Sequence, residues 1–596
     1  MSFAVEPLPL PFDFAPRLPG SKSIAQRALL LAAQAADGGS GTTTLDHVTS
    51  SDDVAAMERG LVALGFAVAR GRSLPHDDEA NERVVVGARD RAIGAATLDA
   101  DLAGTAARFL VALAATTPGR FTVTGRARLQ ERPFAELFAA LRSLGAALPA
   151  DAERLPVTIE GAPLRGGHVR LDASRSSQFL SALLLIAPRC ERGLEIELVG
   201  ALASAPYVEL TIELLARFGV VVERDRASYR VAPQPLRTPG TLRIEDDWSA
   251  AGAWLVLERL ASSRARTPGL AAASRQPDAA LPALLDALEG DGPRTLDVGG
   301  VPDQLMNLAV FAAARRGTTR FTGAANLRWK ESDRVAVLAR ELARAGVAVE
   351  TSADALVVHG PAPLRSAALE CAGDHRMAIA FTLLATLQPG LALIGAECVT
   401  KSDPRFFEQL AAARAAPRCV ALVGMRGAGK STLAVALAER LRLAALDADV
   451  EFERRHGPLA AFVAAHGWPH FREVEAALLA ELLAPGRVVA LGGGAIESAA
   501  NRALLRREAV VLHLDESLPT LSARLAATPR PSLTGADPQS ELAEVAARRA
   551  PLYREIAAAT LPPDRTVEQR RDEAIAALTA LARWPAAAPP ALRLRH

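Results

Sequence analysis

The 596-residue sequence predicts an α/β protein in two unlike parts: a large N-terminal body of repeated αβ units and a smaller C-terminal module with a parallel sheet between helices. Two patterns predict this fold class. In the first part, helices that end in glycine and continue directly into a strand recur along the chain. In the second part, an apolar strand, a glycine-rich loop and an amphipathic helix follow one another.

The repeated joint has the form Leu-x-x-x-Gly followed by apolar residues, and it occurs at residues 61–68, 141–148, 215–222 and 342–349. The glycine can take a left-handed helix cap, and the apolar run after it has strand character. The first two intervals are 141 − 61 = 80 and 215 − 141 = 74 residues, and the third leaves room for another unit near residues 284–290. This spacing predicts units of roughly 70 residues, although such joints also occur in α/β proteins without repeats.

A phosphate-binding loop opens the C-terminal module. Residues 424–431, GMRGAGKS, match the pattern GxxxxGK[ST], with an apolar run before them at 419–423 and an amphipathic helix after them at 432–438. Successive backbone N–H groups at such a helix start can wrap a polyphosphate. Lys430 would reach the β and γ phosphates, and Ser431 would bind Mg²⁺. The sequence therefore predicts a nucleotide site here.

Composition excludes several classes of function. Half of the residues are hydrophobic and the formal net charge is +1, so no nucleic-acid-binding surface is predicted. The four cysteines are far apart and lack CxxC spacing, as in buried thiols of a reducing cytosol. No apolar run of membrane-spanning length and no signal-peptide pattern occur. We expect a cytoplasmic protein that acts on small molecules without a membrane partner; its oligomeric state stays open.

Lysine is rare in this chain. Of 68 basic side chains only four are lysine, namely Lys22, Lys330, Lys401 and Lys430, which leaves 68 − 4 = 64 arginines. Lysine offers a compact, titratable point charge that the planar guanidinium group cannot replace. The lysines therefore mark candidate sites. The alternative is that a few lysines survived a bias in base composition by chance.

Polar clusters in the N-terminal body contain the three lysines outside the phosphate loop. Serines, arginines and carboxylates gather at turns and helix starts in residues 18–27, 102–108, 130–133, 174–178, 301–303, 326–334, 374–376 and 400–403. Such groups suit chemistry on two multiply anionic small molecules. Taken singly, Asp303 also fits a helix cap, and Glu331 with Asp333 also fits a solvated helix face.

These clusters resemble 5-enolpyruvylshikimate-3-phosphate synthase. LPGSKS, LAGT with a following Arg, ERP, SSQFLSALL, NLRWKESDR, DHRMA and the segment 398–410 look like motifs of that family, in order, across about residues 5–413. The resemblance implies an enolpyruvyl transferase fold of two domains, each with three βαβαββ units. The upper domain would comprise residues 19–237, and the lower domain residues 1–18 plus 238–413, with chain crossings near Pro19 and near residues 235–240.

The implied reaction moves the enolpyruvyl group of phosphoenolpyruvate onto the 5-hydroxyl of shikimate 3-phosphate and releases phosphate, without a cofactor. It needs a base, an acid and fixed cations; by motif match Asp303 is the base and Glu331 the acid, and Lys22 is also catalytic. Phosphoenolpyruvate would be held by Lys22, Gly104, Arg132, Gln178, Arg334, Arg376 and Lys401. Shikimate 3-phosphate would be held by Lys22, Ser23, Arg27, Ser176, Ser177, Gln178, Ser204, Tyr207, Asp303, Asn326 and Lys330.

The chain departs from the family's pattern at two places. It has LAGT at 102–105 where the family often has NAGT, and AQR at 25–27 where the family often has SNR. The first departure removes a polar side chain but keeps Gly104, whose N–H can approach a ligand. The sister family that transfers enolpyruvyl to a UDP-sugar usually carries a reactive cysteine in the first third of the chain. Because the first cysteine here is Cys190, that alternative is weaker.

The C-terminal module resembles shikimate kinase over about residues 418–582. After the phosphate loop come DAD at 447–449, FREVE at 471–475, GGG at 492–494, RPSL at 530–533, where the family often has RPLL, and RRAPLY at 548–553. The resemblance implies a P-loop kinase fold of three α/β/α layers that uses ATP and Mg²⁺, with Asp449 as the catalytic carboxylate for the 3-hydroxyl. ATP would be bound by Gly427, Ala428, Gly429, Lys430, Ser431, Thr432 and Arg530; Mg²⁺ by Ser431 and Asp447; and shikimate by Asp449, Arg472, Gly492, Gly493, Gly494 and Arg549.

The two resemblances together predict a bifunctional enzyme of aromatic amino-acid biosynthesis. Its C-terminal module would make shikimate 3-phosphate, which its N-terminal body would consume. One alternative is another small-molecule kinase fused to another enolpyruvyl transferase. A second is a P-loop domain that regulates the body, which predicts slow ATP turnover without stimulation by shikimate. Residues 583–596, rich in Ala and Pro, are expected to form a disordered tail.

Overall fold

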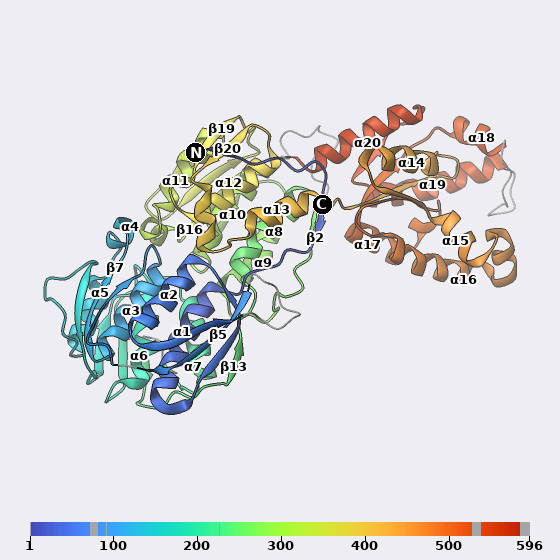
Figure 1. The fold of residues 1–596 in the computed structure, drawn as a ribbon. Coiled ribbons are helices and arrows are strands. Elements are labelled where there is room, and N and C mark those ends of the chain that lie inside the picture. The colour runs from blue at the N-terminus through green and yellow to red at the C-terminus, as the bar shows by residue number, and fades with distance from the viewer. Residues whose placement is uncertain (1, 72–80, 91, 226, 527–537, 584–596) are drawn as a thin grey trace.

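The computed structural model describes residues 2–71, 81–90, 92–225, 227–526 and 538–583. It forms three bodies (Figure 1), each with its own hydrophobic core; Leu110, Leu384 and Leu422 are fully buried, one in each core. The first two bodies are the upper and lower domains of the N-terminal part, and the third is the C-terminal module. The residue limits of the domains stay a prediction, and the tail beyond residue 583 lies outside the described residues.

Three sheets surround a helical centre in the upper domain. Helices α1, α3 and α6 pack against one another and are buried almost all round, because their Ala- and Leu-rich sequences have no continuous polar face. The strands are β3 (Thr43–Thr49), β4 (Phe66–Gly71), β5 (Asn81–Arg89), β6 (Ala95–Asp99), β7 (Gly119–Thr124), β8 (Val157–Gly161), β9 (Gly167–Leu171), β10 (Leu194–Leu198), β11 (Glu223–Arg224), β12 (Ser228–Val231) and β13 (Thr241–Arg243). The helices are α1 (Lys22–Ala35), α2 (Asp52–Ala63), α3 (Gly104–Thr116), α4 (Ala127–Gln130), α5 (Ala135–Ser143), α6 (Ser177–Ile186) and α7 (Pro206–Arg217).

The lower domain has the same kind of layered structure around helices α8, α10 and α12, which contact one another. Its strands are β1 (Ser2–Ala4), β2 (Asp13–Phe14), β14 (Arg264–Ala265), β15 (Arg294–Asp297), β16 (Gly317–Thr322), β17 (Ala348–Thr351), β18 (Leu356–Gly360), β19 (Ala367–Glu370) and β20 (Leu391–Ile394). Its helices are α8 (Trp248–Leu260), α9 (Leu281–Leu288), α10 (Leu305–Ala314), α11 (Arg334–Arg344), α12 (His375–Leu387) and α13 (Phe406–Arg414).

The predicted repeat is present in the sheets. The orders β9-β10-β12-β11 and β15-β16-β18-β17 are identical, with the first pair parallel and the others antiparallel, and each unit runs βαβαββ along the chain. The glycines of the four predicted joints, Gly65, Gly145, Gly219 and Gly346, all have φ between +78° and +101°. A glycine is favoured there because side chains rarely adopt this left-handed conformation.

The C-terminal module is a five-stranded parallel sheet in the order β22-β23-β21-β24-β25, with helices on both sides (Figure 1). Its strands are β21 (Cys419–Gly424), β22 (Ala444–Asp447), β23 (Arg487–Ala490), β24 (Ala509–Leu514) and β25 (Ala559–Leu561). Its helices are α14 (Lys430–Leu441), α15 (Ala448–His456), α16 (Leu459–Leu482), α17 (Ala499–Glu508), α18 (Leu518–Ala526), α19 (Pro538–Ile556) and α20 (Val567–Leu581). Strand β21 is central and apolar throughout, as expected of a strand buried on both faces.

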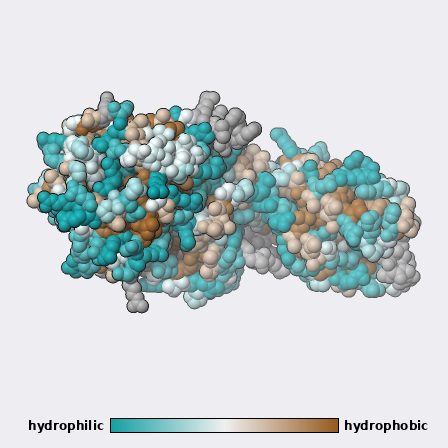
Figure 2. All heavy atoms as spheres, turned by 90° about the horizontal axis from the view of Figure 1, so that it is seen from below, coloured by the Kyte–Doolittle hydropathy of each residue, from teal (hydrophilic) through white to brown (hydrophobic). Residues whose placement is uncertain are grey.

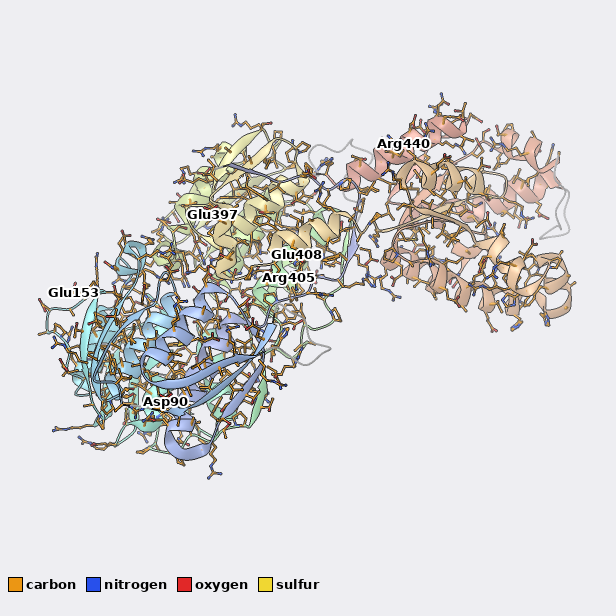
Figure 3. The ribbon with its side chains drawn as sticks, in the orientation of Figure 1. Asp90, Glu153, Glu397, Arg405, Glu408 and Arg440 are labelled. Atoms are coloured by element: carbon orange, nitrogen blue, oxygen red, sulfur yellow. The ribbon has the colours of Figure 1, made fainter. Side chains whose placement is uncertain are left out.

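Polar residues cover much of the face shown in Figure 2, with smaller apolar areas between them. Surface ion pairs such as Arg405–Glu408 at the start of α13, at 2.9 Å, are typical of this outer layer (Figure 3). In the part of the chain that the structure describes, no helix is long and apolar enough to cross a membrane.

Candidate active sites

A cavity between the upper and lower domains brings together most of the residues predicted for the N-terminal body. It includes about 840 Å³ of atom-free space, part of which is open to solvent. Of the predicted residues, it is lined by Lys22, Ser23, Arg27, Gly104, Arg132, Ser176, Ser177, Gln178, Ser204, Tyr207, Asp303, Asn326, Lys330, Glu331 and Arg334. Arg376 and Lys401 lie behind this lining and form ion pairs with Asp303 and Glu331, respectively.

Asp303 lies in a short 3-10 turn, Pro302–Gln304, directly before α10. Its carboxylate accepts hydrogen bonds from Arg334 Nη1 at 2.8 Å and from Arg376 Nη2 at 3.1 Å. Burial alone would raise the pKa of Asp303, but the charges of Arg376, Arg334 and Lys330 outweigh it and hold the pKa below its ordinary value. Two guanidinium groups therefore fix Asp303 as an anion.

Glu331 shares Arg334 with Asp303. Its Oε2 accepts a hydrogen bond from Arg334 Nη2 at 3.1 Å, and its Oε1 lies 3.6 Å from Lys401 Nζ and 3.7 Å from Arg132 Nη1. Burial would raise the pKa of Glu331, but Arg334, Lys401 and Arg132 lower it well below its ordinary value. The two carboxylates with predicted acid and base roles thus bind the same guanidinium group.

Asp53 was not predicted from the sequence, yet it bridges two of the lysines. Its Oδ2 lies 2.9 Å from Lys22 Nζ and its Oδ1 lies 3.0 Å from Lys401 Nζ. Burial would raise the pKa of Asp53, but the two ammonium groups lower it. Lys401 also donates to the carbonyl of Leu102 at 2.8 Å, and Gln26, at the AQR departure, donates to the Asp53 carbonyl at 3.1 Å. No local pattern could have shown that these distant segments meet.

Polar side chains predicted for shikimate 3-phosphate lie at helix starts on both sides of the cavity. Ser176 caps α6 by accepting a hydrogen bond from the backbone N–H of Gln178 at 3.2 Å. Asn326 donates to Ser204 Oγ at 3.0 Å and so connects the lower domain to the upper one. Burial lowers the pKa of Lys330 to about 8. This wall therefore presents hydroxyl and amide groups beside a titratable ammonium group.

Arg27 uses its donors within the protein. Its Nε donates to Thr211 at 2.8 Å, Nη1 to the Ser23 carbonyl at 2.8 Å and Nη2 to the Tyr207 carbonyl at 3.3 Å. Burial lowers the pKa of Arg27 to about 10 and raises the pKa of the Tyr207 hydroxyl well above its ordinary value. Arg27 thus holds α1 against α7, and its guanidinium lines the cavity from that fixed position.

Arg108 connects three of the sequence motifs, although it was noted only as the arginine after LAGT. It donates to Gln178 Oε1 at 2.8 Å, to the Gly104 carbonyl at 3.0 Å and to the Pro133 carbonyl at 2.9 Å. Other lining residues absent from the predicted set are Thr105, Pro133, Arg175, Trp329 and His375. Burial lowers the pKa of His375 well below its ordinary value, so this imidazole is neutral.

Several buried donors around Arg132 lack an acceptor. Nε and Nη1 of Arg132 and Nε of Arg376 have no hydrogen-bond partner among the described residues. A Cβ on Gly104 would lie only 2.3 Å from Arg132 Nη1, so a glycine is needed for the guanidinium to occupy this position. Because buried unpaired donors are costly, this arrangement favours an anionic ligand.

The phosphate loop of the C-terminal module has the predicted context, since it follows β21 and α14 begins at Lys430. Gly427 and Gly429 have φ of +82° and +90°, which other residues rarely adopt. Lys430 Nζ donates to the carbonyls of Gly424 and Met425, both at 3.0 Å. The ammonium group therefore lies across the loop, where phosphate oxygens would be its alternative acceptors.

The three glycines 492–494 lie under three charged side chains. A Cβ on the first would lie 2.9 Å from Asp449 Oδ1, on the second 3.2 Å from Arg549 Nη1, and on the third 2.2 Å from Arg472 Nη2. Larger residues would push these groups away. The glycines therefore let the side chains predicted to bind shikimate converge on one place.

Two carboxylates balance these arginines and were missed in the sequence. Glu475 pairs with Arg472 at 2.5 Å, and Glu497 pairs with Arg549 at 3.0 Å. Burial raises the pKa of Glu475. Asp449 lies in the first turn of α15, and Arg549 lies inside α19.

The residues predicted for Mg²⁺ suit a hard cation, since Ser431 offers a hydroxyl oxygen and Asp447 a carboxylate. Asp447 Oδ1 accepts hydrogen bonds from the backbone of Asp449 at 2.9 Å and of Val450 at 3.2 Å, which caps α15. This cap fixes the carboxylate at the end of β22, beside β23. Arg530, predicted to close over ATP, lies outside the described residues.

Fold and sites define a class of protein: two linked transferases for anionic small molecules, one with a cationic cavity between two domains and one with a P-loop. Residues 16–410 match the family model of EPSP synthase (3-phosphoshikimate 1-carboxyvinyltransferase), and residues 426–579 match that of shikimate kinase. The chain belongs to the EPSP synthase family, with a shikimate kinase domain joined to it, and is a bifunctional enzyme of the shikimate pathway.

Relatives agree with this assignment. A 3-phosphoshikimate 1-carboxyvinyltransferase from Shewanella sp. (strain MR-7) is 35% identical, over 67% of this chain and 96% of the relative. The pentafunctional AROM polypeptide of Malassezia globosa is 34% identical over 90% of this chain, which spans 38% of that relative's length. The structure of EPSP synthase from Acinetobacter baumannii covers 69% of this chain and 98% of its own, with a TM-score of 0.56 and 21% identity, which supports the fold.

Proposed function

We propose that the C-terminal module phosphorylates the 3-hydroxyl of shikimate with ATP, and that the N-terminal body then transfers enolpyruvyl from phosphoenolpyruvate to the 5-hydroxyl of the product. One observation carries the proposal for the N-terminal transferase. Asp303 and Glu331 bind the same buried guanidinium, Arg334, on the wall of a cavity that also holds Lys22 and Arg132. This arrangement supplies a base, an acid and cations for two anionic substrates.

In the transferase, Asp303 accepts the proton of the attacking 5-hydroxyl, and Glu331 gives a proton to the methylene carbon of phosphoenolpyruvate. This addition gives a tetrahedral adduct with a new methyl group. The Glu331 carboxylate then takes a proton back from that methyl group as the C–O bond to phosphate breaks, which forms the enol ether, and the proton held by Asp303 leaves with the phosphate. Without substrate, Arg334, Lys401 and Arg132 hold Glu331 as an anion. A bound carboxylate and phosphate would neutralise these cations, so the pKa of Glu331 would rise and the carboxyl group could carry the proton it must donate.

In the kinase, Asp449 orients the 3-hydroxyl and takes up its proton, while Arg472 and Arg549 bind the shikimate carboxylate. Lys430 exchanges its loop carbonyls for phosphate oxygens and so stabilises the charge of the transferred group. Ser431 and Asp447 would hold Mg²⁺, which would supply positive charge to offset that of the ATP phosphates.

Phosphate release tests both halves in one assay. Purified chain with Mg²⁺ is given ATP, shikimate and phosphoenolpyruvate, and each substrate is omitted in turn. Because the kinase transfers phosphate without freeing it, we expect release only when all three are present. Lys430→Ala should abolish release until shikimate 3-phosphate is supplied, and Lys22→Ala should abolish it under either condition. Release from ATP alone, independent of phosphoenolpyruvate, would contradict the proposal.

The predicted domain limits and location belong to the same proposal. The predicted limits are an upper domain of residues 19–237, a lower domain of residues 1–18 plus 238–413 and a kinase domain of residues 418–582, and three separate hydrophobic cores support a division into three domains. Because β13 pairs with β3 and Ile244 lies in the upper core, we place the second crossing a few residues after 237. Cys190, Cys371 and Cys419 are buried free thiols, which supports a reducing cytoplasm. Limited proteolysis and fractionation of the source cells would test these two points.

A further inference from the structure

Arg570, on α20, contacts the phosphate loop from behind. Its Nη1 donates to the carbonyl of Ala428 at 2.7 Å, and its Nη2 donates to the Asp515 carbonyl at 3.1 Å and to Glu516 at 2.8 Å. Arg570 is only 4% exposed, and Ala428 is fully buried. The guanidinium therefore contacts the loop backbone from within the protein and is not exposed to the solvent.

Glu516 completes this contact with a buried carboxylate. Its Oε2 accepts from Arg570 and from Arg524, which also donates to the Gly427 carbonyl at 3.0 Å. Its Oε1 accepts the backbone N–H groups of Asp564 at 2.8 Å and of residue 517 at 3.2 Å. The carboxylate neutralises the buried charge of Arg570 and fixes its direction, so the arginine cannot easily turn away from the loop.

The position of Arg570 is set by the start of α20. The Thr566 hydroxyl accepts a hydrogen bond from the backbone N–H of Gln569, and the side-chain oxygen of Gln569 accepts one from the backbone N–H of Thr566, which forms a capping box. Helix α20 then packs along α14, the helix that continues the phosphate loop. A rigid helix start therefore presents Arg570 to Ala428.

The direction of the carbonyl groups matters in this loop because the loop binds phosphate through its backbone N–H groups, which point the opposite way. A phosphate loop binds anions when consecutive N–H groups point inward, which requires the carbonyls between them to point outward. Gly427 and Gly429, with positive φ on either side of Ala428, create this alternation. The Arg570 guanidinium donates a hydrogen bond to the Ala428 carbonyl from outside the loop. This bond keeps the carbonyl pointing outward, away from the phosphate site.

We propose that Arg570, oriented by Glu516, is a positioning residue of the kinase reaction: it holds the phosphate loop in its nucleotide-binding shape by binding the Ala428 carbonyl. The proposal rests on the kinase function proposed above. It concerns affinity for the nucleotide and leaves the shikimate pocket around Asp449 and the distant transferase cavity unaffected.

The test compares Arg570→Gln with Arg571→Gln. Arg571 is the next residue on α20 and pairs with Asp572 at the surface, so it is a matched control. The wild-type chain must first phosphorylate shikimate with ATP. If it does not, the proposed kinase function is wrong, whereas the role of Arg570 is still tested by the affinity for Mg·ADP. We expect Arg570→Gln to raise the KM for ATP and the Kd for Mg·ADP about tenfold or more, with KM for shikimate and transferase kcat within about twofold of wild type.

Two further variants separate positioning from general stability. Arg570→Lys can still donate to the Ala428 carbonyl and should lie between wild type and Arg570→Gln. Glu516→Gln keeps the shape of the carboxylate but weakens its hold on Arg570, and it should weaken Mg·ADP binding in the same way. Unchanged Mg·ADP affinity in a folded Arg570→Gln or Glu516→Gln would overturn the proposal. So would an equal loss of affinity for shikimate and nucleotide together with a lower melting temperature.

Discussion

Arg334→Lys keeps the positive charge at the centre of the transferase site but removes the planar fork. Arg334 makes four hydrogen bonds to three carboxylates, those of Asp303 at 2.8 Å, Glu331 at 3.1 Å and Asp374 at 2.8 and 3.2 Å. A lysine ammonium at one point cannot reach all three, so at least two bonds are lost. At about 1.5–3 kcal/mol for each charged bond, the cost is about 3–6 kcal/mol, or roughly a 10²–10⁴-fold loss of kcat/KM if all of it falls on the transition state.

The assay measures phosphate release from phosphoenolpyruvate with shikimate 3-phosphate supplied. Kinase turnover of the same chain reports independently on its concentration and on the folding of the C-terminal module, and thermal unfolding shows any part of the cost that falls on stability. Arg340→Lys is the matched control, because Arg340 lies on the same helix but is half exposed, and its partner Glu341, which is buried, also pairs with Arg344. If Arg334→Lys changes neither kcat/KM nor the melting temperature, the hydrogen bonds of Arg334 to three carboxylates contribute nothing to catalysis or stability, and the reasoning is wrong.

Three further outcomes follow from the two sites. Gly104→Ala should raise the KM for phosphoenolpyruvate about tenfold or more, because the new Cβ would displace the Arg132 guanidinium, 2.3 Å away. Gly494→Ala should likewise raise the KM for shikimate, since its Cβ would lie 2.2 Å from Arg472 Nη2. Burial lowers the pKa of Lys330 to about 8, so kcat/KM for shikimate 3-phosphate should fall as pH rises through 8, and Lys330→Arg should remove that decline.

Two of these outcomes have a control. Gly94→Ala serves for Gly104→Ala: it also changes a glycine of the upper domain, but Gly94 has no positive φ and its Cβ would meet no atom within 4 Å. Normal phosphoenolpyruvate kinetics in Gly104→Ala would contradict the close approach. The pKa of Lys330 in the folded chain lies below its ordinary value of 10.5, so the unfolded chain binds more protons between pH 8 and 10.5. The contribution of this group to stability therefore rises with pH in that range. If kcat/KM fell at alkaline pH because the protein unfolds, the titration of Lys330 would therefore not be the cause.

Local sequence was sufficient for the features that a short segment can encode. The glycine joints at residues 65, 145, 219 and 346 have the predicted backbone conformation, and the phosphate loop lies between a strand and a helix as predicted. Most predicted residues of the N-terminal site line one cavity, because each motif lies at a helix start and the repeated fold directs those starts to the domain interface. Their assigned roles stay predictions.

The residues missed were those defined by a distant partner. Asp53 lies in an ordinary acidic first turn of a helix, and only folding brings it to Lys401, 348 residues away in sequence. Arg570 is one of 64 arginines and differs from its exposed neighbour Arg571 only in the direction it faces. Periodicity can show that a residue is buried, but it cannot show which carbonyl or carboxylate it meets.

The few lysines of this chain show how an ammonium group and a guanidinium group differ in the acceptors they can bind. Lys401 Nζ lies among three acceptors from separate elements, the carbonyl of Leu102 and the carboxylates of Asp53 and Glu331, so a compact charge with three donors fits the space. Arg334, by contrast, meets carboxylates in the plane of its fork. In a chain that uses arginine for nearly every positive charge, lysine persists where acceptors converge on a point. A Lys→Arg exchange at these positions keeps the charge but loses this geometry, so it is not a conservative change here.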